Sequence, residues 1–293
     1  MKRIGLLGTH RNPQVAETLL DTAKFLKREG FEVVLEAESA KTLGAVQFQS
    51  VVLSNLHQKI DLMIAIGGDG NLLHAARTMS LYDIPVIGIN RGQLGFLTDL
   101  SPHTFANTLI PMLHGESVIE ERFLLEAKIL RGNGAIEATG NALNDVVLFP
   151  GDIAQLIEFE LRIDGRFVYS QRSDGLIIAT PTGSTAYALS AGGPILAPHL
   201  HVILLVPKLP HTLTNRPVVI DAKSEIEIRL APYNKMASRL SYDGQNHVTL
   251  NSDDRVIIRK QAKTLKLMHP KGYDYYAIWR EKLEWGKQLI ALG

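Results

Sequence analysis

A change in the hydrophobic pattern near residue 115 constrains the fold of this chain more than any other feature. Before it, segments of helical pattern alternate with short apolar runs, at residues 3–8, 31–35, 61–66 and 85–89. Strands that alternate with helices predict a parallel sheet with helices on both faces. After residue 120, short alternating runs are separated by turn sequences such as Asp164-Gly165 and Asp243-Gly244, which predicts antiparallel strands.

These two patterns predict two domains. We expect a Rossmann-like α/β domain at residues 1–118 and a β-sandwich domain at residues 119–274, with one helix inserted at residues 184–191. A last helical segment, residues 275–293, carries both tryptophans, and we expect it to pack back on the first domain.

The composition excludes several classes of protein. A formal net charge of +1 gives no electrostatic reason to bind nucleic acid, and the absence of cysteine excludes disulfides and thiolate metal sites. The apolar run at residues 4–7 is shorter than the ~7–15 residues of a signal-peptide core. No apolar stretch approaches the ~20 residues of a membrane helix. We therefore expect a cytoplasmic protein that binds neither nucleic acid nor a membrane.

The sequence Gly67-Gly68-Asp69-Gly70 lies between a predicted strand and a helix predicted at residues 71–80. Glycines let a ligand approach the backbone, and the positive end of a helix favours a phosphate. A carboxylate repels phosphate, so Asp69 is expected either to cap the helix or to contact a hydroxyl or a divalent metal beside the phosphates. The chain has neither a P-loop motif nor a GxGxxG motif, so the common phosphate-binding architectures are excluded.

A second stretch, residues 173–196, reads SDGLIIATPTGSTAYALSAGGPIL. Its small hydroxyl and glycine residues precede a short helix, and they either cap that helix or bind polar groups of a ligand. Tyr187 either stacks on a base or packs in the core. A third stretch places Asn144 and Asp145 in an otherwise apolar strand, where buried polar groups need partners. A structural turn and a ligand-facing bulge both explain this third pattern.

Together these stretches resemble the bacterial NAD kinases. GGDGN, ALND, residues 173–196 and PHTLTNRPVVI occur in the family's order and spacing, and the similarity extends to HPKGYDYY near residue 270. The resemblance implies transfer of the terminal phosphate of ATP to the adenosine ribose 2′-hydroxyl of NAD, giving NADP. It also implies an N-terminal α/β domain, a C-terminal β-sandwich, NAD bound between them, and a homodimer or homotetramer.

The resemblance assigns roles to individual residues. Asp69 corresponds to the proposed catalytic base. Asp145 stands where many members have the longer glutamate, and Asn71 stands where many have threonine. The positions that match or adjoin the family's nucleotide-binding residues are Gly67, Gly68, Gly70, His74, Asn144, Asp145, Arg172, Asp174, Thr185, Ala186, Tyr187, Ser190 and Gln245.

The chemistry of phosphoryl transfer depends mainly on positioning and charge neutralisation. A free aspartate, with a pKa of ~3.9, is a weak base for a sugar hydroxyl. We therefore expect Asp69 chiefly to orient the 2′-hydroxyl and to accept its proton late. Magnesium or manganese is expected to arrive with the ATP phosphates, because no cluster in the sequence resembles a dedicated metal cage. His199 and His201 are too sparse to predict a zinc site.

Three other functions fit parts of the pattern. A lipid kinase shares the glycine-aspartate turn, but it needs an apolar groove for its acceptor. A regulatory module would bind NAD without turnover, which the intact Asp69 motif disfavours. A kinase that prefers NADH differs only in its acceptor, and Arg172 does not decide between the two redox forms.

Overall fold

The computed structural model describes residues 1–8, 13–44, 47–91, 95–102, 105–132, 134–151, 156–212, 214–234 and 237–285. Two compact units divide the chain. Unit 1 consists of Met1–Glu121 and Leu265–Gly293, and unit 2 consists of Arg122–Thr264. The predicted domain limits, at residues 118 and 274, stay a prediction.

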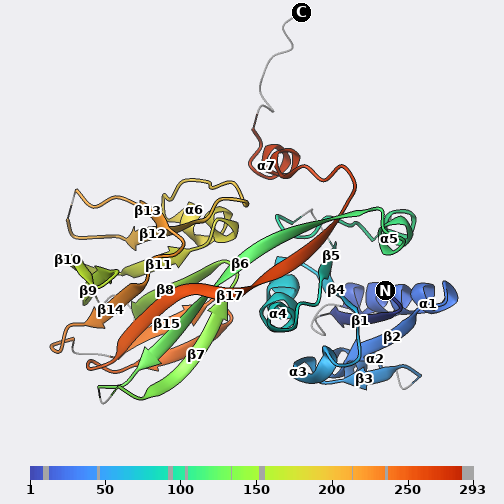
Figure 1. Ribbon diagram of the computed structural model, residues 1–293, viewed down its shortest axis with the longest axis horizontal. Helices are drawn as coiled ribbons and strands as arrows, with labels where there is room; N and C mark the ends of the chain where they lie inside the picture. Colours follow the sequence, from blue (N-terminus) through green and yellow to red (C-terminus); the bar gives the residue numbers. More distant parts are fainter. Residues whose placement is uncertain are drawn as a thin grey trace, which may run out of the picture. The chain divides into compact units, whose positions relative to one another are not determined.

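Unit 1 is built on a parallel sheet (Figure 1). Its strands lie in the order β3-β2-β1-β4-β5, and each neighbouring pair is parallel. The end of β17 (Arg255–Pro270) joins β5 in parallel, with Leu267 opposite Val86. The elements are β1 (Arg3–Gly8), α1 (Pro13–Arg28), β2 (Glu32–Glu36), α2 (Ala37–Leu43), β3 (Gln49–Val51), α3 (Leu53–Leu56), β4 (Leu62–Gly67), α4 (Asp69–Met79), η1 (Ser80–Tyr82), β5 (Val86–Asn90), α5 (Phe105–Leu113) and α7 (Tyr275–Lys282).

The central strand β4 explains why this unit forms. All six of its residues are buried, as a continuous apolar run in a sheet covered on both faces should be. Helix α1 begins at Pro13 and buries Val15, Leu19 and Leu26 in the same hydrophobic cluster as β4. Its predicted cap, Asn12, lies outside the described residues. The alternating strands and helices predicted for this part of the chain are confirmed.

Unit 2 consists mainly of antiparallel strands. One sheet has the order β13-β12-β11-β8-β15-β16. In the other, β10, β9, β14 and β17 are successive antiparallel neighbours, and β6 (Ser117–Leu130) pairs with β7. The elements are β7 (Ile136–Ala142), β8 (Asp145–Pro150), β9 (Ile157–Ile163), β10 (Arg166–Ser173), β11 (Gly175–Ala179), η2 (Thr182–Thr185), α6 (Tyr187–Ser190), β12 (Val202–Lys208), β13 (Val218–Asp221), β14 (Ile226–Leu230), β15 (Ser238–Tyr242) and β16 (Asn246–Leu250).

The inward side chains of the two sheets share one hydrophobic cluster, as expected of a sandwich. In β9, for example, Ile157, Phe159 and Leu161 are buried, and the residues between them are partly exposed. Two predicted hairpin turns are confirmed. Asp164 and Asp243 both have a positive φ, as tight hairpin turns require, and they follow β9 and β15.

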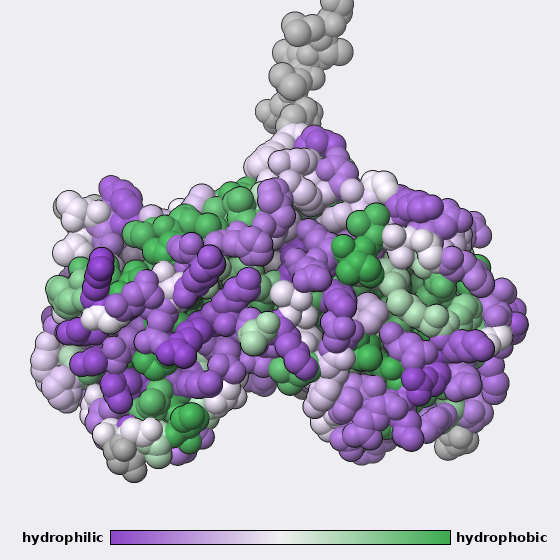
Figure 2. Space-filling view, viewed as in Figure 1, coloured by the Kyte–Doolittle hydropathy of each residue, from purple (hydrophilic) through white to green (hydrophobic). Residues whose placement is uncertain are grey.

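Two long strands, β6 (Ser117–Leu130) and β17 (Arg255–Pro270), contribute residues to both units. The predicted C-terminal helix is shorter than expected, since α7 ends at Lys282, and residues 286–293 lie outside the described part. Among the described residues, no helix is long and apolar enough to cross a membrane. On the face shown in Figure 2, hydrophobic side chains form separate patches among hydrophilic ones.

Candidate active site

The Gly67-Gly68-Asp69-Gly70 sequence forms the turn from β4 into α4. Gly67 has a φ of 132°, which favours glycine, and a Cβ there would also overlap the Asn71 side chain. The Asn71 amide donates a hydrogen bond to the Ile66 carbonyl at 2.6 Å. Asn71 therefore ties the first turn of the helix to the end of the strand.

The Asp69 carboxylate is held by residues far along the chain. Its Oδ2 accepts the Phe96 N–H at 2.9 Å, and its Oδ1 accepts the Leu97 N–H at 3.3 Å and the Thr98 hydroxyl at 3.2 Å. The N-cap position belongs to Gly68, and no side chain caps α4. The interpretation of Asp69 as a simple helix cap is therefore wrong.

The segment 95–100 is built to approach this carboxylate closely. A Cβ on Gly95 would overlap both the Asp69 carboxylate and the Thr98 hydroxyl, so only glycine fits. At its other end, the Leu100 N–H donates to the Gly88 carbonyl at 3.3 Å, which attaches the segment to β5. Asp69 is thus fixed from both α4 and the segment beside β5.

This arrangement leaves Asp69 able to accept one more hydrogen bond. An ionised carboxylate has about four lone-pair sites. Among the described residues, two donors meet Oδ1 and one meets Oδ2, which leaves Oδ2 a site for a donor such as a sugar hydroxyl. The start of α4 carries partial positive charge, which favours a phosphate nearby. His74 lies one helical turn further along α4 and is exposed.

A second polar turn lies in unit 2, where residues 143–144 connect β7 to β8 and Asp145 begins β8. The Asp243 carboxylate accepts the N–H groups of Leu143 at 3.1 Å, Asn144 at 2.8 Å and Asp145 at 3.3 Å. Asp243 is at the tip of the hairpin between β15 and β16. Asn144 therefore lies in this turn, and Asp145 is the first residue of β8, where it pairs with Ala179 of β11.

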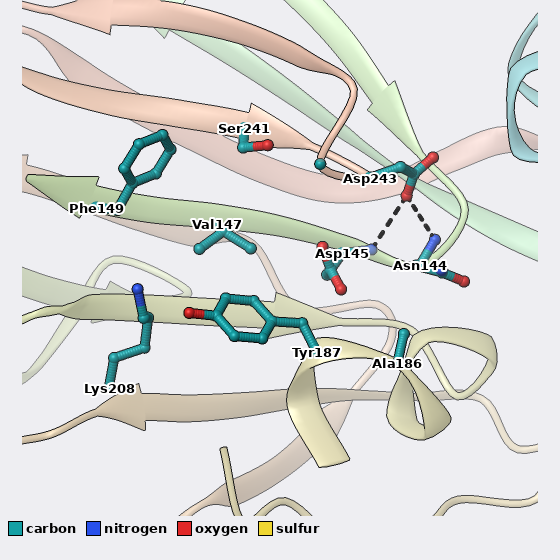
Figure 3. A pocket seen from close by; sticks show the side chains of 10 residues that line it. Asn144, Asp145, Val147, Phe149, Ala186, Tyr187, Lys208, Ser241 and Asp243 are labelled. Carbon is teal, nitrogen blue, oxygen red and sulfur yellow. Dashed lines mark hydrogen bonds between the residues drawn. The ribbon is translucent and has the colours of Figure 1, made fainter. Parts of the chain in front are cut away.

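The same turn lines a pocket of ≈ 370 Å³ in unit 2. Figure 3 shows the Tyr187 ring between Asp145 and Lys208, with its hydroxyl toward Lys208. The Lys208 Nζ lies 5.2 Å from the centre of the Tyr187 ring. The pocket is lined by Asn144, Asp145, Val147, Phe149, Ala186, Tyr187, Lys208, Ser241, Asp243 and Gly244. It combines an apolar wall with carboxylates and one cation, which suits a ring-bearing polar ligand.

The two carboxylates of this pocket influence each other. Asp145 is 4% exposed. Its burial, and then the nearby charge of Asp243, raise the pKa of the Asp145 carboxyl from 3.8 to about 7. A donor from a ligand would replace lost solvation and stabilise the ionised form. Asp145 is thus a carboxyl whose charge near neutral pH depends on what occupies the pocket.

The hydroxyl-rich turn of residues 180–185 is occupied largely by internal bonds. The Thr180 hydroxyl donates to the Leu143 carbonyl at 2.5 Å, and the Ser184 hydroxyl donates to the Pro181 carbonyl at 2.6 Å. The Thr185 hydroxyl donates to the Thr182 carbonyl at 3.2 Å. These bonds favour the structural interpretation of the hydroxyls over direct ligand binding.

The prediction of a single helix at residues 184–191 is wrong. The segment consists of η2 and α6, which are separate because Ala186 has a φ of −100° and a ψ of −128°, outside the helical region. This break places Ala186 and the exposed Tyr187 on the pocket wall. Tyr187 is therefore available to a ligand, whereas the alternative interpretation buried it in the core.

The structure brings only part of the predicted set together. Asn144, Asp145, Ala186 and Tyr187 line one pocket. Within the described chain, its lining does not include the other predicted residues of unit 2, which are Arg172, Asp174, Thr185, Ser190 and Gln245. Sequence reasoning missed Lys208 and Asp243 in the pocket and Phe96 and Thr98 at Asp69. For Lys208 the available signal was a single cation after the apolar run of β12.

Comparisons with known proteins identify the family of this chain. The family model of the ATP-NAD kinase N-terminal domain matches residues 4–117, and that of the ATP-NAD kinase C-terminal domain matches residues 143–269. The chain belongs to the ATP-NAD kinase family. A relative named NAD kinase from Shewanella halifaxensis is 48% identical over 287 residues, which cover 98% of this chain and 92% of the relative. An NAD kinase from Aeromonas salmonicida is 47% identical over 290 residues, which cover 99% of this chain and 98% of the relative.

Solved structures of ATP-NAD kinase-like proteins share the fold. An NAD kinase from Archaeoglobus fulgidus, solved in complex with ATP, is 26% identical with a TM-score of 0.76, covering 96% of this chain and 98% of that one. The yeast NADH kinase, solved in complex with NADH, is 23% identical with a TM-score of 0.89. The match covers 100% of this chain and 90% of that one. The second likeness concerns the fold alone. The α/β plus β-sandwich architecture predicted from the sequence is confirmed.

Proposed function

We propose that this protein transfers the terminal phosphate of ATP to the 2′-hydroxyl of the adenosine ribose of NAD, giving NADP. Membership of the ATP-NAD kinase family supports the reaction. The observation that carries it is the Asp69 carboxylate, which three donors fix at the start of α4 with one acceptor site left. In the proposed complex, the donor at that site is the 2′-hydroxyl of the adenosine ribose.

Asp69 is the proposed catalytic base. Its three hydrogen bonds fix the orientation of the carboxylate, which places an oxygen to accept a hydrogen bond from the sugar. The attacking oxygen becomes acidic only as it bonds to phosphorus, and the proton passes to Asp69 at that stage. Help of this kind is typically worth ~10²–10⁴-fold. Gly67, Gly68 and Gly70 allow the substrate to approach the backbone, and His74 is a further proposed contact.

Unit 2 supplies the proposed dinucleotide contacts. Asn144 and Asp145 offer an amide and a carboxyl to ribose hydroxyls, and Tyr187 offers a ring face for stacking. The remaining proposed contacts of this unit are Arg172, Asp174, Thr185, Ala186, Ser190 and Gln245. We also propose that the protein acts as a homodimer or homotetramer, which light scattering on the purified protein would measure.

A divalent cation, magnesium or manganese, is proposed to enter with ATP as part of the substrate. In the described ranges, no group of three or more histidine, aspartate or glutamate side chains could hold a metal ion. The ligands of the cation would therefore be mainly phosphate oxygens and water, an arrangement that magnesium tolerates well. Its chemistry there is neutralisation of phosphate charge during transfer.

The test is NADP formation by the purified protein from NAD and ATP, with magnesium and with EDTA. NADH is assayed in parallel as acceptor. Asp69→Asn should lower kcat by ~10²–10⁴-fold with little change in the Kd for NAD. The matched control is Asp21→Asn, an exposed aspartate of α1, which should retain wild-type turnover. Wild-type turnover in Asp69→Asn would refute the assignment of the base, and NAD binding without NADP formation would indicate a regulatory module instead.

A further inference from the structure

A buried histidine lies behind the segment that holds Asp69. His269, near the end of β17, is 2% exposed. Its Nδ1 bonds to the Asp99 carboxylate, and its Nε2 lies 3.2 Å from the Glu120 carboxylate. One face of the ring stacks on Tyr273, with the ring centres 3.7 Å apart. The proposed phosphoryl transfer does not itself require a histidine at this place.

The geometry indicates that His269 is an imidazolium. Ionised carboxylates only accept hydrogen bonds, so a ring nitrogen must carry hydrogen to bond to one. Carboxylates face both nitrogens, and a neutral ring would direct a lone pair at one of them. Burial lowers the pKa of His269, but the bonds to Asp99 and Glu120 outweigh this effect and raise it above its usual value.

Asp99 connects this cation to Asp69. It directly follows Thr98, and residues 96–98 supply all three donors to the Asp69 carboxylate described above. The second oxygen of Asp99, Oδ1, is buried and has no hydrogen-bond partner among the described residues. The orientation of the Asp99 side chain therefore depends on its bond to His269.

We propose that His269 is a positioning residue, which holds Asp99 against Glu120 and thereby fixes the donors of segment 95–99 that orient the Asp69 carboxylate. The proposal rests on the proposed function. The Leu100 bond to Gly88 anchors the segment beyond Asp99, and His269 anchors it at the residue next to the donors. An Asp69 oxygen displaced by about 1 Å loses the alignment that phosphoryl transfer needs.

The experiment is a double-mutant cycle between His269→Gln and Asp69→Asn. In the wild-type background, His269→Gln should lower kcat by up to roughly 10²-fold with both KM values unchanged. In the Asp69→Asn background it should produce no further loss, because the carboxylate it positions is gone. The control is Lys266→Gln, because Lys266 lies on the same strand as His269 and forms an exposed ion pair with Asp83. This substitution should leave kcat unchanged in both backgrounds.

The outcomes separate the two proposals. An equal loss of kcat in both backgrounds would mean that His269 acts only on stability, and it would overturn the positioning role. Absence of NADP formation by wild-type protein would overturn the function instead. Circular dichroism verifies that each variant is folded. If His269→Gln does not fold, Glu120→Gln takes its place in the cycle, since it removes one of the two carboxylate charges and keeps an oxygen acceptor facing the ring.

Discussion

Asp145 links the chemistry of the pocket to the stability of the protein. Its burial and the charge of Asp243 raise its pKa from 3.8 to about 7 in the folded state. The folded protein therefore binds this proton more tightly than the unfolded chain does. As the pH rises from 3.8 to about 7, the free energy of unfolding falls. Above this range, the full cost of ionising Asp145 in the folded protein is present.

The size of this cost follows from the pKa values. A difference of roughly three units, at about 1.4 kcal/mol per unit, amounts to about 4 kcal/mol. Asp145→Asn removes the ionisable group at nearly constant size. Since nearly two fifths of the cost is already present at pH 5, the variant should gain about 2.5 kcal/mol relative to wild type between pH 5 and pH 8.5.

The assay is urea unfolding at these two pH values, followed by far-UV circular dichroism, without ligand. The control is Asp253→Asn, which makes the same substitution at an exposed aspartate of the same unit. The reasoning is refuted if the difference between Asp145→Asn and wild type is the same at both pH values, or if wild type becomes the more stable protein at pH 8.5.

Two further predictions concern the ligand and the base. If ribose hydroxyls donate to ionised Asp145, the Kd for NAD should be about tenfold lower at pH 8.5 than at pH 6, because the free carboxyl is then already ionised. Isothermal titration calorimetry measures this, and an unaltered pH dependence in Asp145→Asn would contradict it. Gly95→Ala should push the Asp69 carboxylate out of place and lower kcat by about tenfold or more, with the Kd for NAD unchanged. A folded Gly95→Ala protein with wild-type kcat would show that the close approach of the two residues is unimportant.

The turn at Asp69 could be predicted from the sequence because its parts are consecutive. An apolar strand, three glycines and a helical pattern follow one another within residues 62–79. The partners of its carboxylate could not be predicted in this way, since they lie 27 to 29 residues further along the chain. No periodicity in residues 95–98 marks them as donors. Only the return of this segment along β5 brings them to Asp69.

In the pocket, too, only some of the residues could be predicted from the sequence. Asn144, Asp145 and Tyr187 stand out because polar or aromatic groups interrupt patterns of apolar or small residues. Lys208 does not stand out, because a lysine that ends a buried strand usually reaches solvent. Asp243 was recognised as part of a hairpin turn, but its carboxylate also accepts three N–H groups from a turn some 100 residues earlier. Such long-range capping depends on which strands are neighbours in the sheet.

The discontinuity of unit 1 has a consequence during translation. The ribosome completes all of unit 2 before it adds Leu267, which extends the sheet at β5, and His269, which joins Asp99 to Glu120. Until then, two carboxylates lack the cation between them. A nascent chain can thus form the pocket around Asp145 before His269 secures the segment that holds Asp69, so the order of synthesis places the completion of that segment last.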